Sequence, residues 1–165
     1  MRVLGIDPSL QSTGFGIIEY SGTSYFPVVY GVVKPSPKLA FPRRLNEIRT
    51  EIEKVIASFS PDEAAIENTF FAQNVRTALS LGQVRGAILV SLASTSLELF
   101  EYSALEIKKA VTGYGRAGKD QVRTMVKTLL NLEDDALSLD ASDALATGIC
   151  HLNSRIFQSK LKDAF

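Results

Sequence analysis

Four acidic residues of this 165-residue chain each adjoin a run of apolar residues. Asp7 follows the run LGI, Glu67 follows AAI, and Asp140 and Asp143 share the segment LDASD. An ionised carboxylate at the edge of a core is costly unless a positive charge compensates it. No Lys, Arg or His is a sequence neighbour of any of the four. A hard divalent metal ion is the simplest compensation, so the sequence predicts a metal site built from these acids.

Length and composition favour one domain. A chain of 165 residues with 45% hydrophobic content fills one core and is short for two. We therefore expect a single domain over residues 1–165, with a loosely packed tail over about 153–165. The lone Cys150 excludes an intrachain disulfide, and the lone His151 excludes a site with several histidines. The first apolar stretch, Val3–Ile6, is too short for a secretory signal or a membrane span, which favours a cytoplasmic location without membrane association.

Charge is balanced overall but segregated along the chain. The 18 basic and 18 acidic residues give a net charge of zero, yet the stretch from Glu133 to Asp143 carries only acids. The stretch from Glu101 to Leu130 has three acids and a larger set of bases, namely Lys108, Lys109, Arg116, Lys119, Arg123 and Lys127. Solvated helix faces also carry such charges, so the basic stretch alone is weak support for a polyanionic partner.

Apolar alternation and turn signals predict five short strands. The first three, Arg2–Asp7, Thr13–Tyr20 and Tyr25–Val33, are close enough in sequence to form an antiparallel meander. Two more, Glu63–Glu67 and Leu97–Phe100, each follow a predicted helix. The expected fold class is α/β, with a five-stranded mixed sheet made of the meander and two parallel strands and flanked by helices.

Three- and four-residue spacings of apolar residues predict the helices. These are Leu45–Phe59 with Pro42 near the first turn, Val75–Ser94 capped by Asn74, a helix from the capping box at Ser103 to Val111, about Asp120–Leu130, and about Asp140–Leu152. Residues 153–165 form a polar tail, for which a helix is one alternative. The 75–94 helix is apolar all round, so it is either central to the domain or shared with a second copy. Its polar residues, Arg76, Gln83 and Arg85, argue against a membrane span.

The four acids can converge. Asp140 and Asp143, three residues apart on a helix, project from one face, and Asp7 and Glu67 end strands that we expect to run parallel. Mg²⁺ prefers oxygen ligands and keeps several waters, which leaves room for a substrate phosphate. Two such ions about 3.5–4 Å apart activate water and stabilise the leaving oxygen of a phosphodiester. The sequence therefore predicts a metal-dependent nuclease, although each acid alone also suits a helix cap, a turn or a strand end.

The segment Gly113–Lys119 fits both G-x-G-x-x-G and G-x-x-x-x-G-K. A dinucleotide site requires a strand before the motif, whereas the capping box at Ser103 indicates a helix there. A phosphate-binding P-loop requires Ser or Thr after the lysine, whereas Asp120 stands at that position and would repel phosphate. We interpret the segment as a flexible basic loop that lies against a phosphate backbone, with Lys119 at its edge.

Taken together, the motifs resemble those of the RuvC family of bacterial Holliday junction resolvases. The strings LGIDPS and TGFG, residues 4–9 and 13–16, resemble the opening of that family. AIE at residues 65–67, followed by Phe70 and Asn74, resembles its second catalytic strand and long helix, and DASDALA at 140–146 completes the match. The resemblance covers nearly the whole chain and weakens after about Cys150.

The resemblance implies an RNase H-like fold, a homodimer, and a magnesium-dependent endonuclease that resolves four-way junctions by symmetric paired nicks in DNA recombination and repair. It implies that Asp7, Glu67, Asp140 and Asp143 are catalytic ligands of two Mg²⁺ ions, with Mn²⁺ as a substitute. Lys119 would act beside them at the scissile region. Expected DNA contacts are Phe70, Lys108, Arg116, Lys119 and Arg123. A branch-migration helicase complex is a further expected partner.

Other functions remain open from the sequence. An RNase H-like nuclease of other specificity, such as one that processes pre-ribosomal RNA, also has an aspartate at a strand end. A non-catalytic junction-binding protein would share the basic stretch. Gly5-Ile6-Asp7 with Thr13-Gly14 also resembles the phosphate loop of actin-like ATPases, but 165 residues leave no room for the second lobe of that fold. The loop Ser9–Ser12 departs from family members that have a Gly-Ser pair and a basic residue there, which puts its DNA contacts in doubt.

Overall fold

A computed structural model describes residues 1–68, 74–95, 97–133 and 137–162. Within them, one five-stranded sheet has the order β3-β2-β1-β4-β5. β1 pairs antiparallel with β2 and parallel with β4, β2 pairs antiparallel with β3, and β4 pairs parallel with β5. The strands are β1 (Arg2–Asp7), β2 (Thr13–Ser21), β3 (Ser24–Val33), β4 (Glu63–Glu67) and β5 (Glu98–Tyr102). The predicted mixed sheet is confirmed, and only β5 is displaced, beginning one residue and ending two residues later than predicted.

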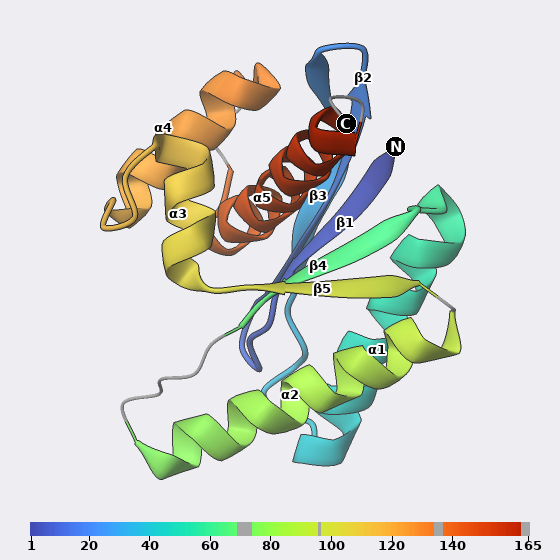
Figure 1. Ribbon diagram of the computed structural model, residues 1–165. Helices are drawn as coiled ribbons and strands as arrows, with labels where there is room; N and C mark the ends of the chain where they lie inside the picture. Colours follow the sequence, from blue (N-terminus) through green and yellow to red (C-terminus); the bar gives the residue numbers. More distant parts are fainter. Residues whose placement is uncertain (69–73, 96, 134–136, 163–165) are drawn as a thin grey trace.

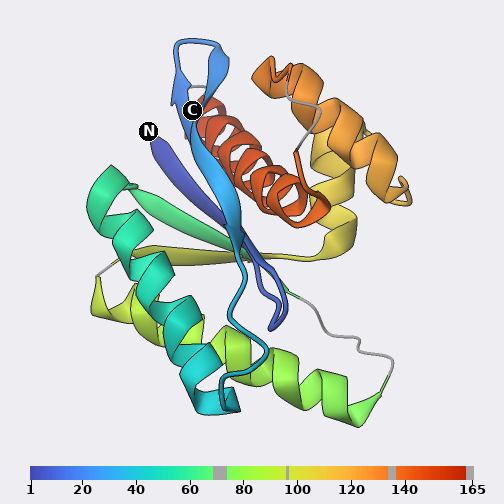
Figure 2. The same cartoon turned by 180° about the vertical axis from the view of Figure 1, so that it is seen from behind.

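Helices cover both faces of this sheet, so the molecule has three layers (Figures 1 and 2). One face is covered by α1 and α2, and the other by α5, which is flanked by α3 and α4. The bounds are α1 (Phe41–Phe59), α2 (Val75–Ser94), α3 (Ala104–Thr112), α4 (Lys119–Leu130) and α5 (Leu139–Lys162). The predicted positions of the first four helices are therefore confirmed to within a few residues at their ends.

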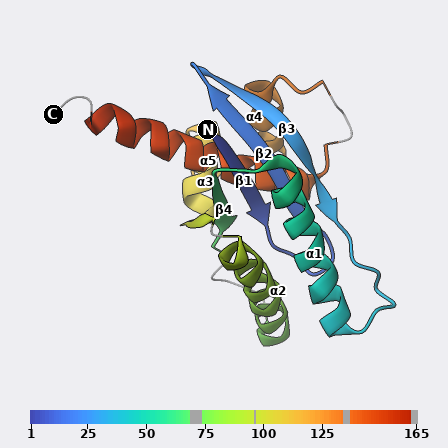
Figure 3. The same cartoon turned by 90° about the vertical axis from the view of Figure 1, so that its right-hand side faces the viewer.

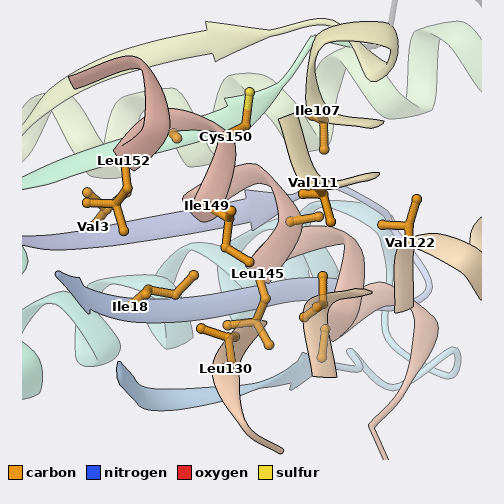
Figure 4. Close-up of a cluster of buried hydrophobic side chains, with 14 of the residues drawn as sticks. Val3, Ile18, Ile107, Val111, Val122, Leu130, Leu145, Ile149, Cys150 and Leu152 are labelled. Atoms are coloured by element: carbon orange, nitrogen blue, oxygen red, sulfur yellow. The ribbon is translucent and has the colours of Figure 1, made fainter. Parts of the chain in front are cut away.

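Strand alternation divides the apolar residues between two cores. In β1, Val3 packs with the α3–α5 layer, whereas Leu4 and Ile6 pack with α1 and α2. Figure 4 shows the first core, in which Ile18 of β2 lies near Leu145 and Ile149 of α5. Because odd-numbered residues of β1 point to the α5 layer, the residue that ends the strand, Asp7, belongs to that side as well.

Local capping agrees with the sequence signals. The Asn74 side chain accepts a hydrogen bond of 2.9 Å from the Thr77 backbone N–H, and Ser103 and Glu106 form the predicted capping box. Gly113 ends α3 in the left-handed conformation with φ 75°, and Gly118 is the N-cap of α4. The glycine-rich segment thus connects two helices, which confirms that it lacks the preceding strand of a dinucleotide site.

The last helix is longer than predicted. α5 continues without interruption from Leu139 to Lys162, so the predicted end near Leu152 is wrong, and the alternative of a helical tail is confirmed as far as Lys162. Two side chains beyond that point anchor the helix, because Asn153 Nδ2 donates to the Ala110 carbonyl at 3.2 Å and Arg155 pairs with Glu63. Later turns project beyond the sheet (Figure 3), where Phe157 is 64% exposed.

α2 lies in an outer layer and is not central to the domain, which removes one of the two interpretations of its composition. Only one side, with Val84, Ile88, Ser91 and Leu92, is buried. The other side exposes Val75, Leu79 and Val90 to 75%, 64% and 63%. Of the described helices, α2 is the one with the length and apolar composition to cross a membrane, and 22% of that stretch is buried inside the domain.

α5 rests directly on the backbone of β1 and β2. A Cβ added to Gly5 would lie 2.0 Å from the Ala144 carbonyl oxygen, and one added to Gly14 would lie 2.0 Å from the Asp140 carbonyl oxygen. Real Cβ atoms essentially never come so close to another atom, so any side chain at these two positions would lift the helix. The two glycines therefore fix the height of α5 above the sheet at the turns that carry Asp140 and Asp143.

We expect Gly14→Ala to destabilise the protein, because its new methyl group meets backbone atoms of α5 that cannot rotate away. Overpacking of this kind lowers the free energy of unfolding by about 1–3 kcal/mol. Urea denaturation measures the change. The control is Gly31→Ala, whose Cβ would lie 3.0 Å from the tip of the Phe15 ring, a side chain that can move. Equal losses in both variants would contradict a specific backbone contact at Gly14.

Candidate active site

Asp7 and Glu67 occupy equivalent places at the ends of neighbouring parallel strands. Ile6 pairs with Ile66 in the register of β1 and β4, and each acid is the next residue along its strand. Gly5 and Ala65, two residues earlier, both face the α5 layer. Because side chains alternate along a strand, Asp7 and Glu67 face that layer too. Strand pairing alone therefore brings the first two predicted acids together.

α5 supplies the other two acids from its first two turns. The Asp143 side chain is 18% exposed and lines a cavity that Asp7 and Glu67 also line. Asp140 does not line that cavity, although its charge acts on Asp7. The structure thus gathers three of the four predicted acids at one cavity and places the fourth within electrostatic range.

The cavity has a volume of about 290 Å³ and combines acidic, basic and apolar walls. Lysines from α3 and α4 stand opposite the acids, and apolar side chains of the same helices close the sides. Its lining residues are Asp7, Glu67, Ala104, Ile107, Lys108, Lys119, Val122 and Asp143. Asp143 of the acidic stretch and Lys119 of the basic stretch therefore line the same cavity.

The two lysines differ in their contacts. Lys119 Nζ donates to Asp143 Oδ2 at 3.1 Å, while its side chain stays 64% exposed. Lys108 lines the cavity from α3. The other predicted DNA contacts lie outside it: Arg116 is exposed in the loop before α4, and Arg123 pairs with Asp120 at 3.4 Å. Phe70 falls outside the described residues.

The acids lack sufficient positive compensation. Burial, followed by the charges of Glu67, Asp143 and Asp140, raises the pKa of Asp7 to about 8, and Lys119 only partly offsets these effects. Burial and the Asp143 charge likewise raise the pKa of Glu67. The hydrogen bond that Lys119 donates to Asp143 raises the pKa of Lys119, which therefore stays protonated at neutral pH. The cavity is thus a place where one more cation would be strongly favoured.

The donor chemistry fits a hard divalent ion. Carboxylate oxygens are the ligands that Mg²⁺ and Mn²⁺ prefer, and the three acids of the cavity outnumber its two lysines. Among the described residues, no three Asp, Glu, His or Cys side chains are gathered closely enough to hold one metal ion. An open arrangement around a cavity suits Mg²⁺, which keeps several waters and takes few protein ligands.

The sequence did not reveal the role of Arg85, which holds the backbone of Glu67. Arg85 of α2 donates to the Glu67 carbonyl oxygen at 3.0 Å and pairs with Glu101 at 2.6 Å. It therefore fixes the end of β4, from which the Glu67 carboxylate projects. The available signal was an arginine in the middle of a largely apolar helix, because a partly buried guanidinium requires hydrogen-bond acceptors.

We expect Asp7→Asn to stabilise the metal-free protein at pH 8. The folded-state pKa of Asp7, about 8, exceeds its ordinary value of 3.8, so stability is lost as pH rises between these values. An amide cannot ionise, so the variant avoids this loss and should gain about 1 kcal/mol, or about 2–4 °C in melting temperature. Thermal melts at pH 5 and pH 8, with and without MgCl₂, measure both the gain and its reversal by the ion.

Asp120→Asn is the matched control, since Asp120 is 89% exposed and does not line the cavity. It should leave the melting temperature unchanged at both pH values. A lower melting temperature for Asp7→Asn than for the unmodified protein at pH 8 without metal would contradict the electrostatic account.

Comparisons with known proteins agree with this geometry. The sequence profile of the family described as "Crossover junction endodeoxyribonuclease RuvC" matches residues 3–151. The protein of that description from Geobacter sulfurreducens is 46% identical over 162 residues, which cover 98% of each chain. Its counterpart from Alkaliphilus metalliredigens is 43% identical over 162 residues, which cover 98% of this chain and 99% of the relative.

Solved structures give the same result. The structure titled "T. thermophilus RuvC in complex with Holliday junction substrate" superposes with a TM-score of 0.89 at 30% identity, covering 94% of this chain and 96% of the other. The yeast mitochondrial Holliday junction resolvase Ydc2 shares the fold, with a TM-score of 0.68 at 13% identity. The predicted RNase H-like fold is thereby confirmed, and the chain belongs to the RuvC family.

Proposed function

We propose that this protein is a structure-selective DNA endonuclease that resolves four-way junctions by symmetric paired nicks, in recombination and repair. The observation that carries the proposal is the cavity at the ends of β1 and β4, where three acids face two lysines. Family membership supports the same activity. The substrate of the Thermus thermophilus relative is named as a Holliday junction, which supports a four-way junction as the substrate of this chain.

Asp7, Glu67, Asp140 and Asp143 would hold two Mg²⁺ ions, with Mn²⁺ as a substitute. Bound ions of this kind activate water for attack on phosphorus and stabilise the leaving oxygen. Asp7 would have to be ionised to hold an ion, and because its pKa is about 8 its carboxyl group would have to release a proton to do so at neutral pH. Ile107 and Val122 form apolar walls of the cavity.

Lys119 has a different task once a phosphate arrives. Its Nζ now donates to Asp143 Oδ2, and the exposed side chain can donate instead to a phosphate oxygen beside the acids. Lys108, on the same wall, would neutralise part of the phosphate charge. Arg116 and Arg123, and Phe70 beyond the described residues, are proposed as more distant DNA contacts. Such phosphate contacts supply affinity without reading sequence.

We propose that two copies of the chain associate through α2. Val75, Leu79 and Val90 lie on one side of this helix, and all three are exposed. Gly82 and Gly86 lie between them on the same side, where an added Cβ would meet nothing within 4 Å. An apolar stripe with small residues at its centre permits close approach of a second copy about a two-fold axis. Two active sites would then face two of the four strands of a junction.

Further features of the proposal follow from family membership. A branch-migration helicase complex would deliver the junction, and the protein would act in the cytoplasm, where bacterial DNA is located. The whole of residues 1–165 would act as one domain.

We expect the purified protein with Mg²⁺ to nick a synthetic four-way junction at symmetric positions in two strands. Asp7→Asn should bind the junction with unchanged affinity but not cut it. The substitution removes a proposed ligand of the metal ion and leaves the side chains that contact phosphate in place. Strand mapping on denaturing gels measures the cuts, and a gel-shift titration measures the binding. Linear duplex DNA and structured RNA of equal length serve as control substrates.

Three results would count against the proposed activity. Equal cutting of the linear duplex would contradict structure selectivity, preferred cutting of the RNA would indicate an RNA-processing nuclease, and binding without any metal-dependent cutting would indicate a non-catalytic junction binder.

We expect Leu79→Asp to convert the dimer to monomers, because a charge buried in an apolar contact is strongly unfavourable. Sedimentation velocity measures the change in mass. Phe157→Asp is the matched control: Phe157 is also 64% exposed but lies near the end of α5, away from α2. Dissociation by Phe157→Asp together with a dimeric Leu79→Asp would place the contact on α5 instead.

A further inference from the structure

A second polar cluster lies where β4 begins, at the opposite end of the strand from the active site. Glu63 Oε2 is 2.6 Å from His151 Nε2 and accepts a hydrogen bond of 2.9 Å from Arg155 Nε. Glu63 Oε1 accepts a further hydrogen bond from the second arm of the Arg155 guanidinium. One carboxylate of β4 thus receives three hydrogen bonds from two side chains of α5, and both of its oxygens are used.

The histidine in this cluster is fully buried and held on both sides. Its ring is inaccessible to solvent, and Nδ1 lies 2.8 Å from the Tyr102 hydroxyl of β5. Burial lowers the pKa of His151, so the ring is neutral at physiological pH. A neutral ring that donates from Nε2 to Glu63 must accept at Nδ1, and the Tyr102 hydroxyl therefore donates to it. The ring has one orientation that satisfies both contacts.

Contacts with an aromatic ring also hold His151 and Arg155 in place. The Phe100 ring of β5 lies 4.5 Å from the His151 ring, centroid to centroid. The Arg155 guanidinium carbon lies 4.5 Å from the centre of the same Phe100 ring. A cation over an aromatic face adds attraction to the ion pair with Glu63. The cluster therefore joins α5 to both parallel strands by directional contacts.

The distance between this cluster and the active site is nearly the same along β4 as along α5. Glu63 and Glu67 lie on one face of β4, four residues and about 13 Å apart. Asp143 and His151 lie on α5, eight residues and about 12 Å apart. The chain directions are opposed, so Asp143 meets Glu67 at one end while His151 meets Glu63 at the other. A slide of α5 by one residue would break the cluster and displace Asp143 from the cavity at the same time.

We propose that Glu63, His151 and Arg155 are positioning residues for the nuclease reaction, which set the register of α5 on β4 and so hold Asp143 opposite Glu67. The inference rests on the proposed function. The need for such residues is electrostatic, because Asp7, Glu67 and Asp143 repel one another when no cation is present. Gly5 and Gly14 determine how closely α5 approaches the sheet, but contacts of glycine with backbone do not prevent sliding along it. The hydrogen bonds to Glu63 do prevent sliding.

The test compares Arg155→Met and Glu63→Leu with the unmodified protein. Arg155→Met retains an unbranched side chain over Phe100 and removes the hydrogen bonds, and Glu63→Leu removes the acceptor. Both should lower kcat at saturating junction by about 10-fold or more and raise the Mg²⁺ concentration for half-maximal rate, as seen when groups that orient metal ligands are removed. The junction dissociation constant should stay within about twofold, because the phosphate-contacting lysines are not held by this cluster.

Two further variants separate positioning from general stability. Glu63→Gln keeps one oxygen that can accept from His151 Nε2 and Arg155 Nε and loses the other acceptor, so it should lower kcat by less than Glu63→Leu does. Ile56→Ala is the stability control, since Ile56 is 7% exposed in α1 on the opposite face of the sheet. At a temperature where Ile56→Ala and Arg155→Met are folded to the same extent, Ile56→Ala should keep kcat within about twofold. Circular dichroism measures the folded fraction.

A readout without catalysis completes the test. MgCl₂ should raise the melting temperature of the unmodified protein and of Ile56→Ala, and should raise that of Arg155→Met by less. If Arg155→Met and Glu63→Leu match Ile56→Ala in kcat, Mg²⁺ requirement and Mg²⁺-induced melting shift, the cluster has a purely structural role and the inference is wrong. If the unmodified protein cuts no junction, the proposed function fails, while the melting shifts still report whether the cluster positions the ion site.

Discussion

The contact on which this molecule depends is the one between the backbone of α5 and the backbone of β1 and β2. Gly5 and Gly14 leave no side chain between them, so the helix lies as close to the sheet as polypeptide chains can pack. This closeness places the first turns of α5 over the ends of β1 and β4, where Asp7 and Glu67 project. The acids of the site thus come from distant parts of the sequence, and a glycine contact determines whether they meet.

The resulting site contains fewer positive than negative side chains. Two lysines face three acids in one cavity, and the carboxyl group of Asp7 holds its proton to about pH 8. Such an arrangement costs stability in the absence of a bound ion, and active sites commonly carry costs of this kind. In a RuvC-family nuclease that acts on junction DNA, the shortage of positive side chains leaves acids without ion-pair partners, and this favours the binding of metal ions. Lys119 contacts Asp143 but remains largely exposed, so its pairing is readily exchanged.

Local signals in the sequence were sufficient for most of the fold. Alternation gave the three strands of the meander, and caps at Asn74 and Ser103 located α2 and α3, because these features depend on near neighbours in the chain. The end of α5 was not predictable in this way. The turn beyond Leu152 is held by Arg155, whose acceptor Glu63 lies 92 residues earlier. The choice between a central and an outer α2 also required tertiary structure, because an apolar composition does not identify which side is buried.

In the candidate site, too, the sequence predicts the identity of the residues but not their arrangement. The roles proposed for Asp7, Glu67, Asp140 and Asp143 follow from motifs, whereas their relative distances depend on how α5 packs. The cavity lining includes Asp143 and omits Asp140, a difference that three residues of helix spacing cannot reveal. Arg85 was equally hidden, because its acceptors are a backbone carbonyl and a carboxylate on two different strands.

Arg85 also gives α2 a significance beyond packing. The helix exposes an apolar side at Leu79 and Val90, and from its flank Arg85 reaches the backbone of Glu67. Since a helix with its side chains is about 10 Å across, any molecule that covers the exposed side lies within about one helix diameter of a strand that lines the acidic cavity. The surface proposed for association and the proposed metal site are therefore linked directly. Arg85 belongs to the helix that carries the exposed apolar side, and it donates to the backbone of Glu67, which is proposed to hold the metal.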